Sequence, residues 1–286
     1  MNPIKTLLRH IVDYAGLYPP AALPLPEVLR NYALYQHSEA SWMLGRLVMG
    51  SAQLPAFQNL RPSLPPGRWP LSVLALTPED WETLTVCMQQ GLPVKAIETR
   101  AETALQVAQV AGMGRKLGLR DIYIEVPLDQ PELLSAIRAQ ECYAKARTGG
   151  VVQKAFPDPE LLLHFLQDCV KLELPFKLTA GLHHPVRGCY RLTYAPDSEK
   201  GLMYGFLNVL LATAFTLQGL PELAKKALLE EDQGAFHWLS DGLEYAGVKI
   251  QNPQLERTRA MLHAFGSCSF TEPHDELLST ALERNP

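Results

Sequence analysis

The stretch 142-CYAKARTGGVVQKAFPDPELLLHFLQDCVKLELPFKLTAGL-182 contains the pattern that predicts the fold. It begins with a short β-prone run at 142–148, continues with an apolar helical run at 158–171 and ends with a second β-prone run at 176–182. Asp158 stands before a proline, and a capping side chain followed by proline is typical of a helix N-terminus. A strand, a helix and another strand in this order predict a parallel sheet with crossover helices.

The same alternation continues towards the N-terminus and predicts a barrel. Further candidate strands lie at residues 11–15, 42–49, 71–76, 94–99 and 121–126. Helical stretches lie at residues 26–38, 55–60, 78–90, 102–117 and 131–139. This order indicates the α/β class and a (β/α)8 TIM-like barrel, whose eighth strand we expect near residues 265–270. An open Rossmann-like sheet is the alternative, but no G-x-G-x-x-G motif follows the first strand.

The part of the chain before the expected last strand is mainly helical. Helical runs lie at residues 202–218, 221–230 and 254–264. The polar residues Ser240-Asp241-Gly242 between apolar runs predict a β-hairpin within residues 236–250. We therefore expect one barrel domain over residues 1–286, with a mainly helical insertion at residues 202–264.

Composition excludes several classes of protein. A hydrophobic content of 47% and a charged content of 20% are ordinary for a globular chain. The net charge of −4 and the lack of a Lys/Arg run argue against nucleic acid or an anionic membrane as partner. Five scattered cysteines without a C-x-x-C pair favour a reducing, cytoplasmic location. We expect a small-molecule substrate as the partner, and the sequence leaves a homo-oligomer open.

Side chains alternate between the two faces of a strand, which sorts each barrel strand into an inner and an outer face. In the last quoted strand the apolar residues share one face, and Lys177, Thr179, Gly181 and His183 share the other. The apolar face belongs against the surrounding helices. We therefore expect Lys177, Thr179 and His183 to face the barrel interior.

The same sorting places further charged side chains inside the barrel, namely Glu98, Glu125, Lys145 and Arg147. Interior positions of such barrels are usually occupied by Val, Ile and Leu, so these charges need an explanation. A structural ion-pair network, such as Arg147 with Glu98 or Glu125, is one interpretation. An active site is the favoured one, because the polar positions lie towards the C-terminal ends of the strands, where barrel active sites are found.

Two lysines on neighbouring strands point to a particular chemistry. Like charge and desolvation both lower the pKa of an ammonium group and leave a neutral amine, which can attack a carbonyl to form a Schiff base. Lys145 and Lys177 are the two candidates, and Glu98 or Glu125 could transfer protons. This pattern predicts a lyase or aldolase-like enzyme that acts on a small carbonyl compound.

The motifs A-K-A-R-T-G-G at residues 144–150 and F-K-L-T-A-G-L at residues 176–182 resemble the sixth and seventh strands of class I, deoxyribose-phosphate-aldolase-like barrels. Those strands carry a Schiff-base lysine in a K-x-S/T-x-G context and a second lysine in a K-x-x-G-G context. The resemblance implies that Lys145 is the Schiff-base lysine and that Lys177 lowers its pKa.

The resemblance also implies backbone contacts to a phosphate group at Gly149, Gly150 and Gly181. The chain departs from the family motif at two places. Arg147 stands where the family has a small hydroxyl residue, and Ala180-Gly181 replaces the double glycine. We expect Arg147 to hold a phosphate or carboxylate of the substrate.

Two other functions remain open. His183 and His184 could bind a divalent metal with a glutamate, as in a metal-dependent lyase or hydrolase, if the chain turns at Pro185. Without that metal we expect no cofactor. A non-catalytic small-molecule-binding or assembly protein is the third hypothesis.

The remaining site candidates flank the first and last strands. Ser267 and Ser269 stand in the run F-G-S-C-S-F, where barrels of this kind often bind phosphate, and a plain turn is the alternative. Asp13 either joins the site or caps a helix, and the face on which Arg46 lies is ambiguous.

Overall fold

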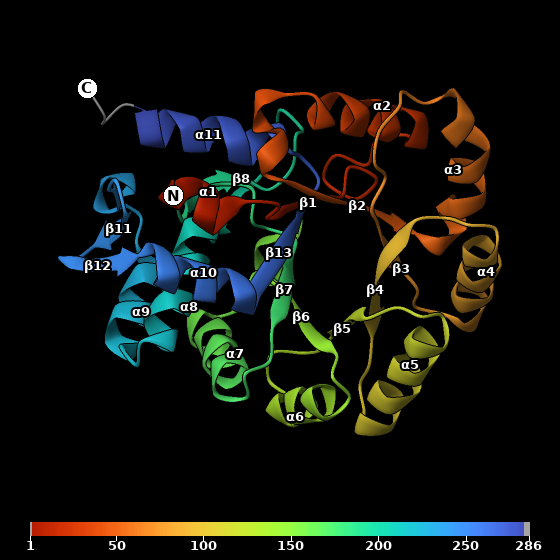
Figure 1. Cartoon of the computed structure of the whole chain (residues 1–286). Helices are drawn as coiled ribbons and strands as arrows, with labels where there is room; N and C mark the ends of the chain where they lie inside the picture. The colour runs from red at the N-terminus through yellow and green to blue at the C-terminus, as the bar shows by residue number, and fades with distance from the viewer. Residues whose placement is uncertain (1, 283–286) are drawn as a thin grey trace.

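The computed structural model describes the backbone of residues 2–282 and the side chains of residues 2–278. Eight parallel strands close into a barrel, and Figure 1 shows helices α2 to α7 arranged around the ring of strands. In spatial order the barrel strands are β1 (Val12–Tyr14), β13 (Leu262–Ser267), β7 (Phe176–Thr179), β6 (Tyr143–Arg147), β5 (Asp121–Glu125), β4 (Val94–Arg100), β3 (Leu71–Leu74) and β2 (Leu44–Gly50). The (β/α)8 barrel predicted from the sequence is confirmed.

The helices follow the barrel strands in the expected alternation. They are α1 (Pro3–Leu8), α2 (Leu25–Gln36), α3 (Leu54–Leu60), α4 (Pro78–Gln89), α5 (Ala104–Lys116), α6 (Pro131–Ala139), α7 (Pro159–Lys171), α8 (Phe206–Leu217), α9 (Pro221–Leu229), α10 (Asn252–Met261) and α11 (Thr271–Leu282). Short 3₁₀ helices are η1 (Glu39–Trp42), η2 (Ser51–Gln53), η3 (Arg61–Ser63), η4 (Gln153–Ala155) and η5 (Gln233–Ala235). Helices α1 and α11 did not stand out in the sequence.

Local side-chain chemistry sets several helix starts. Thr77 and Asp80 form a capping box at the start of α4, and the Asp158 carboxylate accepts a hydrogen bond from the Glu160 backbone N–H at the start of α7. Each of these helices has proline at its first position, where the missing N–H costs nothing. Helix α8 is buried from residue 206 to residue 215, because it packs against α7, α9 and α10.

The region between β7 and β13 contains small antiparallel sheets as well as helices. Strands β8 (Gly188–Arg191) and β9 (Lys200–Met203) form one hairpin. Strands β10 (His237–Trp238) and β11 (Gly242–Tyr245) form the hairpin expected around Ser240-Asp241-Gly242, and β12 (Val248–Gln251) adds an unexpected third strand. Residues 202–264 therefore contain more strand than the predicted helical insertion.

The last barrel strand begins three residues earlier than its predicted position at residues 265–270. The sequence pattern extends the preceding helix to residue 264, but α10 ends at Met261 and β13 begins at Leu262 without a loop. Leu262 and Ala264 are buried and His263 is only partly buried, which is the alternation of a strand. The apolar residues that resembled a helical face therefore belong to the barrel.

The register of the strands aligns four of the charged residues across β4 to β7. Lys145 pairs with Lys177 across β6 and β7, and Glu125 pairs with Lys145 across β5 and β6. On the next strand Arg100 pairs with Glu125. In the part of the chain that the structure describes, no helix has the length and apolar composition needed to cross a membrane.

The contact between α7 and the barrel gives a direct test of the packing. The rings of Phe165 and Phe176 meet edge to face with their centroids 5.5 Å apart, and Phe165 is 1% exposed. We expect Phe165→Ala to lower the free energy of unfolding by about 3–5 kcal/mol, because it leaves a cavity against β7. Urea denaturation would measure this loss. Leu161→Ala on the exposed side of α7 is the control, with an expected effect within about 0.5 kcal/mol.

Candidate active site

A cavity of about 320 Å³ opens at the C-terminal end of the barrel. The side chains around it come from the ends of the strands and from the segments that follow them. From the set predicted from sequence, it is lined by Glu98, Glu125, Lys145, Arg147, Gly150, Thr179, Gly181, His183 and His184. Active sites of this barrel fold lie at this end.

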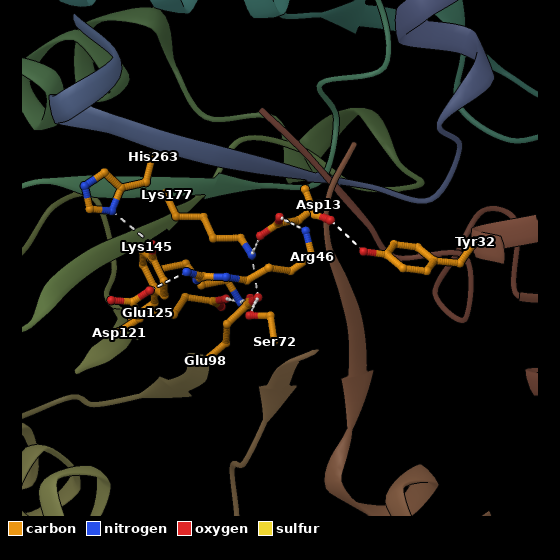
Figure 2. A network of polar contacts seen from close by, with 12 residues as sticks. Asp13, Tyr32, Arg46, Ser72, Glu98, Asp121, Glu125, Lys145, Lys177 and His263 are labelled. Carbon is orange, nitrogen blue, oxygen red and sulfur yellow. Dashed lines mark hydrogen bonds and ion pairs between the residues drawn. The ribbon is translucent and has the colours of Figure 1, made fainter. Parts of the chain in front are cut away.

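Glu98 is the centre of the polar network beneath the cavity. Its Oε1 accepts hydrogen bonds from Lys177 Nζ at 2.5 Å and from Ser72 Oγ at 2.6 Å. Its Oε2 lies 2.9 Å from Lys145 Nζ. Figure 2 shows the two lysines converging on this carboxylate. Burial opposes the ionisation of Glu98, but Lys145 and Lys177 outweigh it and hold the pKa of this carboxyl well below its usual value.

Lys177 lies behind the cavity and not in its wall. Its side chain is fully buried, and Nζ also donates to Asp13 Oδ2 at 2.5 Å. The ammonium lies 5.6 Å from the centre of the Tyr123 ring. Burial lowers the pKa of Lys177, but Asp13 and Glu98 overcome that effect and raise the pKa above its ordinary value. Asp13 therefore joins the network, and Lys177 remains a cation.

Lys145 is the lysine that reaches the cavity. Its Nζ lies between two carboxylates, 2.9 Å from Glu98 Oε2 and 3.0 Å from Glu125 Oε2, and its side chain is 5% exposed. Lys145 is therefore the only member of the pair that a small molecule in the cavity can touch in the described structure.

Two arginines connect Glu125 to the rim of the cavity. Arg100 Nη2 donates to Glu125 Oε1 at 2.9 Å, and Arg147 Nε lies 4.0 Å from the same oxygen. Both arginine side chains are 53% exposed. Burial acts to raise the pKa of Glu125, but Lys145 and then Arg147 and Arg100 lower it below its ordinary value. The rim therefore carries positive charge that is accessible to solvent.

The glycines shape the backbone beside this rim. Gly181 has a φ of +78°, and a Cβ on Gly149 would lie 2.9 Å from the Gly181 Cα and 2.5 Å from the Phe156 ring. Only residues without a side chain allow this close approach. Gly150 and Gly181 line the cavity, whereas Gly149 lies against Gly181 outside the lining.

The two histidines are held by α11. His183 Nδ1 lies 3.2 Å from Glu272 Oε2, and His184 Nδ1 lies 2.8 Å from Glu276 Oε2. The two rings are 6.5 Å apart, and the ring of His184 stacks on Tyr190. Among the residues whose side chains are described, no group of three or more His, Cys, Asp and Glu is arranged to hold a metal ion.

The serines at the end of β13 serve the local structure. Ser267 Oγ lies 3.3 Å from His183 Nδ1 and accepts from the Ser269 backbone N–H. Ser269 Oγ accepts from the Glu272 backbone N–H at the start of α11. Neither serine lines the cavity, whereas Gly266 and Cys268 do.

Some residues of the site were not found from the sequence. Arg100 lies one residue beyond the predicted end of its strand, on the same face as Glu98, so the alternation itself could have found it. Ser72 is fully buried among apolar residues of β3, which is also a usable signal. Tyr194 and Glu272 line the cavity from a loop and from α11, where no sequence pattern marks them.

No family model matches the sequence, and no curated protein sequence matches it significantly. Several solved structures are similar to the chain. The alignment with QR15, an aldolase, covers 97% of this chain and 99% of that chain, with 12% identity and a TM-score of 0.38. The dihydropteroate synthase from Xanthomonas albilineans, in complex with 7,8-dihydropteroate, covers 98% and 95%, with 13% identity and a TM-score of 0.45.

FabK from Thermotoga maritima is also similar, with 13% identity and a TM-score of 0.42. That alignment covers 65% of this chain and 56% of the FabK chain. An aldolase is thus among the similar structures, but likenesses at this level carry no conclusion about activity.

The shared carboxylate predicts a large energetic effect in the barrel core. We expect Lys177→Met to lower the free energy of unfolding by about 3–5 kcal/mol, because it leaves Asp13 and Glu98 buried with less compensating charge. The double variant Lys177→Met/Asp13→Asn should recover part of the lost free energy of unfolding, because it removes one of the two buried carboxylates that have lost the lysine. Urea denaturation of the three proteins would measure both effects. A double variant no more stable than Lys177→Met would contradict the pairing.

Stability should also depend on pH through Glu98. Because its folded-state pKa is lowered, its contribution is present above the unfolded-state pKa of about 4.3 and is lost as the pH falls. We expect the difference in Tm between the wild type and Glu98→Gln to be largest near neutral pH and to shrink below about pH 4. A series of thermal melts measures this, and a difference that stays constant with pH would exclude an ionised Glu98.

Proposed function

We propose that the protein is an enzyme of the lyase or aldolase type that forms an imine between Lys145 Nζ and a small carbonyl compound in the C-terminal cavity. The observation that carries this proposal is the placement of Lys145. It presents the one described lysine amine in the wall of the cavity, and carboxylate oxygens lie within 3.0 Å of it on two sides.

The charges around Lys145 suit the intermediate of such a reaction. An ammonium and a carbonyl combine to give a protonated imine and one water molecule, so the positive charge on Nζ is the same before and after. Glu98 and Glu125 therefore stabilise the protonated imine as they stabilise the ammonium.

Proton transfers in the proposed reaction can be assigned to Glu125. It accepts the proton that the ammonium must lose before attack. After attack the nitrogen gives one proton to the former carbonyl oxygen, and Glu125 returns the other, so that this oxygen leaves the carbinolamine as water. Glu125 is better placed than Glu98 for this role, because its side chain is 12% exposed and that of Glu98 is 2% exposed. Glu98 acts as the fixed counter-ion.

Lys177 has a positioning role in this proposal. Its ammonium, held charged by Asp13 and Glu98, stands as a fixed cation behind Lys145 and offsets part of the negative charge of Glu98. The role that the sequence predicts for Lys177 beside Lys145 stays a prediction.

The cavity also limits the substrate. A volume of about 320 Å³ is at the small end of the range for ligand pockets. Arg100, Arg147 and Arg191 line it, so a carboxylate or phosphate on the substrate would find a cationic partner at the rim. We therefore propose a small aldehyde, ketone or keto acid with one anionic group.

Trapping of the imine tests the proposal directly. We expect borohydride to fix at least one member of a panel of small aldehydes, phosphorylated aldehydes and keto acids to the protein, with the added mass on the peptide that contains Lys145. Lys145→Arg should abolish trapping at every pH, because a guanidinium stays protonated and is not an amine nucleophile. The control is Lys154→Arg, at an exposed lysine seven residues after Arg147. It should form the trapped adduct as the wild type does.

The acid-base role of Glu125 has its own readout. We expect Glu125→Gln to slow trapping by about 10²-fold or more near neutral pH while leaving the adduct on Lys145. An adduct on Lys177, or trapping that survives in Lys145→Arg, would overturn the assignment. If the wild type traps nothing across the panel, the buried charges are a structural network only.

A further inference from the structure

A second, larger cavity of about 1060 Å³ lies at the opposite, N-terminal end of the barrel. Its walls come from the starts of the strands and the segments before them, including Gly45 on β2, Lys95 on β4 and His263 on β13. It shares no lining residue with the C-terminal cavity. In barrels of this fold the N-terminal face is associated with stability and not with catalysis, so a cavity here needs its own explanation.

The lining of this cavity, here called the N-terminal pocket, is strongly cationic. Its basic side chains are Arg9, Arg46, Arg61, Arg68, Lys95 and Arg259. Each of its two carboxylates already has a cationic partner, because Asp13 forms an ion pair with Lys177 and Asp121 forms one with Arg46. Within the described side chains, the other five cations form no ion pair with a carboxylate. This accumulation contrasts with the net charge of −4 of the whole chain.

Arg259 fixes a positive charge at the base of the N-terminal pocket. Its guanidinium donates to the backbone carbonyl oxygens of Leu262, His263 at 2.9 Å and Arg9 at 3.1 Å. These bonds use three of the five N–H donors and hold the group rigidly between α10, β13 and α1. Burial lowers the pKa of Arg259 to about 10, so the group is still charged at neutral pH. Carbonyl oxygens orient this charge but do not neutralise it.

The groups near Arg259 do not fully compensate its charge, because Asp13, a carboxylate that acts on Arg259, is already paired with Lys177. His263 has its pKa lowered to about 4 by burial and by Arg259, so it is uncharged near neutral pH. Its Nδ1 lies 2.9 Å from the Tyr123 hydroxyl. The nearby ammonium group of Lys177 already forms ion pairs with Asp13 and Glu98. A partly buried cation without a counter-ion is stabilised most simply by an anion bound from solution.

We propose that the N-terminal pocket is a binding site for a small polyanion, a molecule with two or more phosphate or carboxylate groups. More than one anionic group is indicated because the cations lie at two levels. Arg46 and Arg259 are partly buried, whereas Arg9, Arg68 and Lys95 are exposed. A small molecule suits the pocket better than a nucleic acid, because the cations line a cavity and the chain as a whole is acidic.

Calorimetric titration of the full chain with pyrophosphate and, separately, with citrate tests the site and distinguishes a phosphate from a carboxylate ligand. We expect saturable binding of at least one of them that weakens as NaCl is raised. Arg259→Met should raise Kd about tenfold or more, because a charge-assisted contact is lost. Lys116→Met, at an exposed lysine that lines neither cavity, is the matched control and should leave this Kd unchanged. Arg147→Met, at the rim of the opposite cavity, shows whether the anion binds there instead.

A second variant covers the case in which Arg259→Met does not fold, which circular dichroism would show. Arg68→Ala/Lys95→Ala removes two exposed cations of the pocket, and we expect it to raise Kd several-fold and to reduce the salt dependence. Three results would overturn the proposal: no binding of either anion at low ionic strength, the same Kd in the wild type and the pocket variants, or binding that is lost only in Arg147→Met.

Discussion

The Glu98 carboxylate is shared by two ammonium groups, with Lys177 on one oxygen and Lys145 on the other, and the interior of the barrel is arranged around this sharing. Charges removed from water are stable only when they are paired. The barrel therefore has to bring side chains of β1, β4, β6 and β7 together in its interior, because Asp13, Glu98, Lys145 and Lys177 must meet. The usual branched apolar layer is replaced at this level by ion pairs.

The two lysines differ in function because they differ in depth. They pair directly across β6 and β7, yet Lys177 is enclosed while Lys145 borders the cavity. The same carboxylate thus has a structural partner on one side and a chemically accessible partner on the other. Removal of one lysine affects the environment of the other, so the effects of variants at these positions should not be additive.

Sequence alternation was enough to predict the barrel and to place Glu98, Lys145 and Lys177 inside it, because a strand has a period of two residues whatever surrounds it. Depth along the barrel axis was not predictable, because it depends on the stagger between strands. The face of Arg46 was ambiguous for another reason, because β2 carries apolar residues on both of its faces. The N-terminal pocket was not predicted from the sequence, because its cations come from separate segments, such as those around Arg9, Arg68 and Arg259. No local pattern unites them.

The signs of the buried charges follow the order of the chain. The three carboxylates come from β1, β4 and β5, and both lysines come from β6 and β7. A nascent chain that has emerged only as far as β5 therefore carries Asp13 and Glu98 without the lysines that pair with them, whereas Glu125 already has Arg100 as a partner. Domains form from the N-terminus during synthesis, but here the first five strands cannot bury their interior alone. Strand β13 lies between β7 and β1, so the ring of strands closes only when β13 has been made, and a fragment that ends before β6 is not expected to form a stable half-barrel.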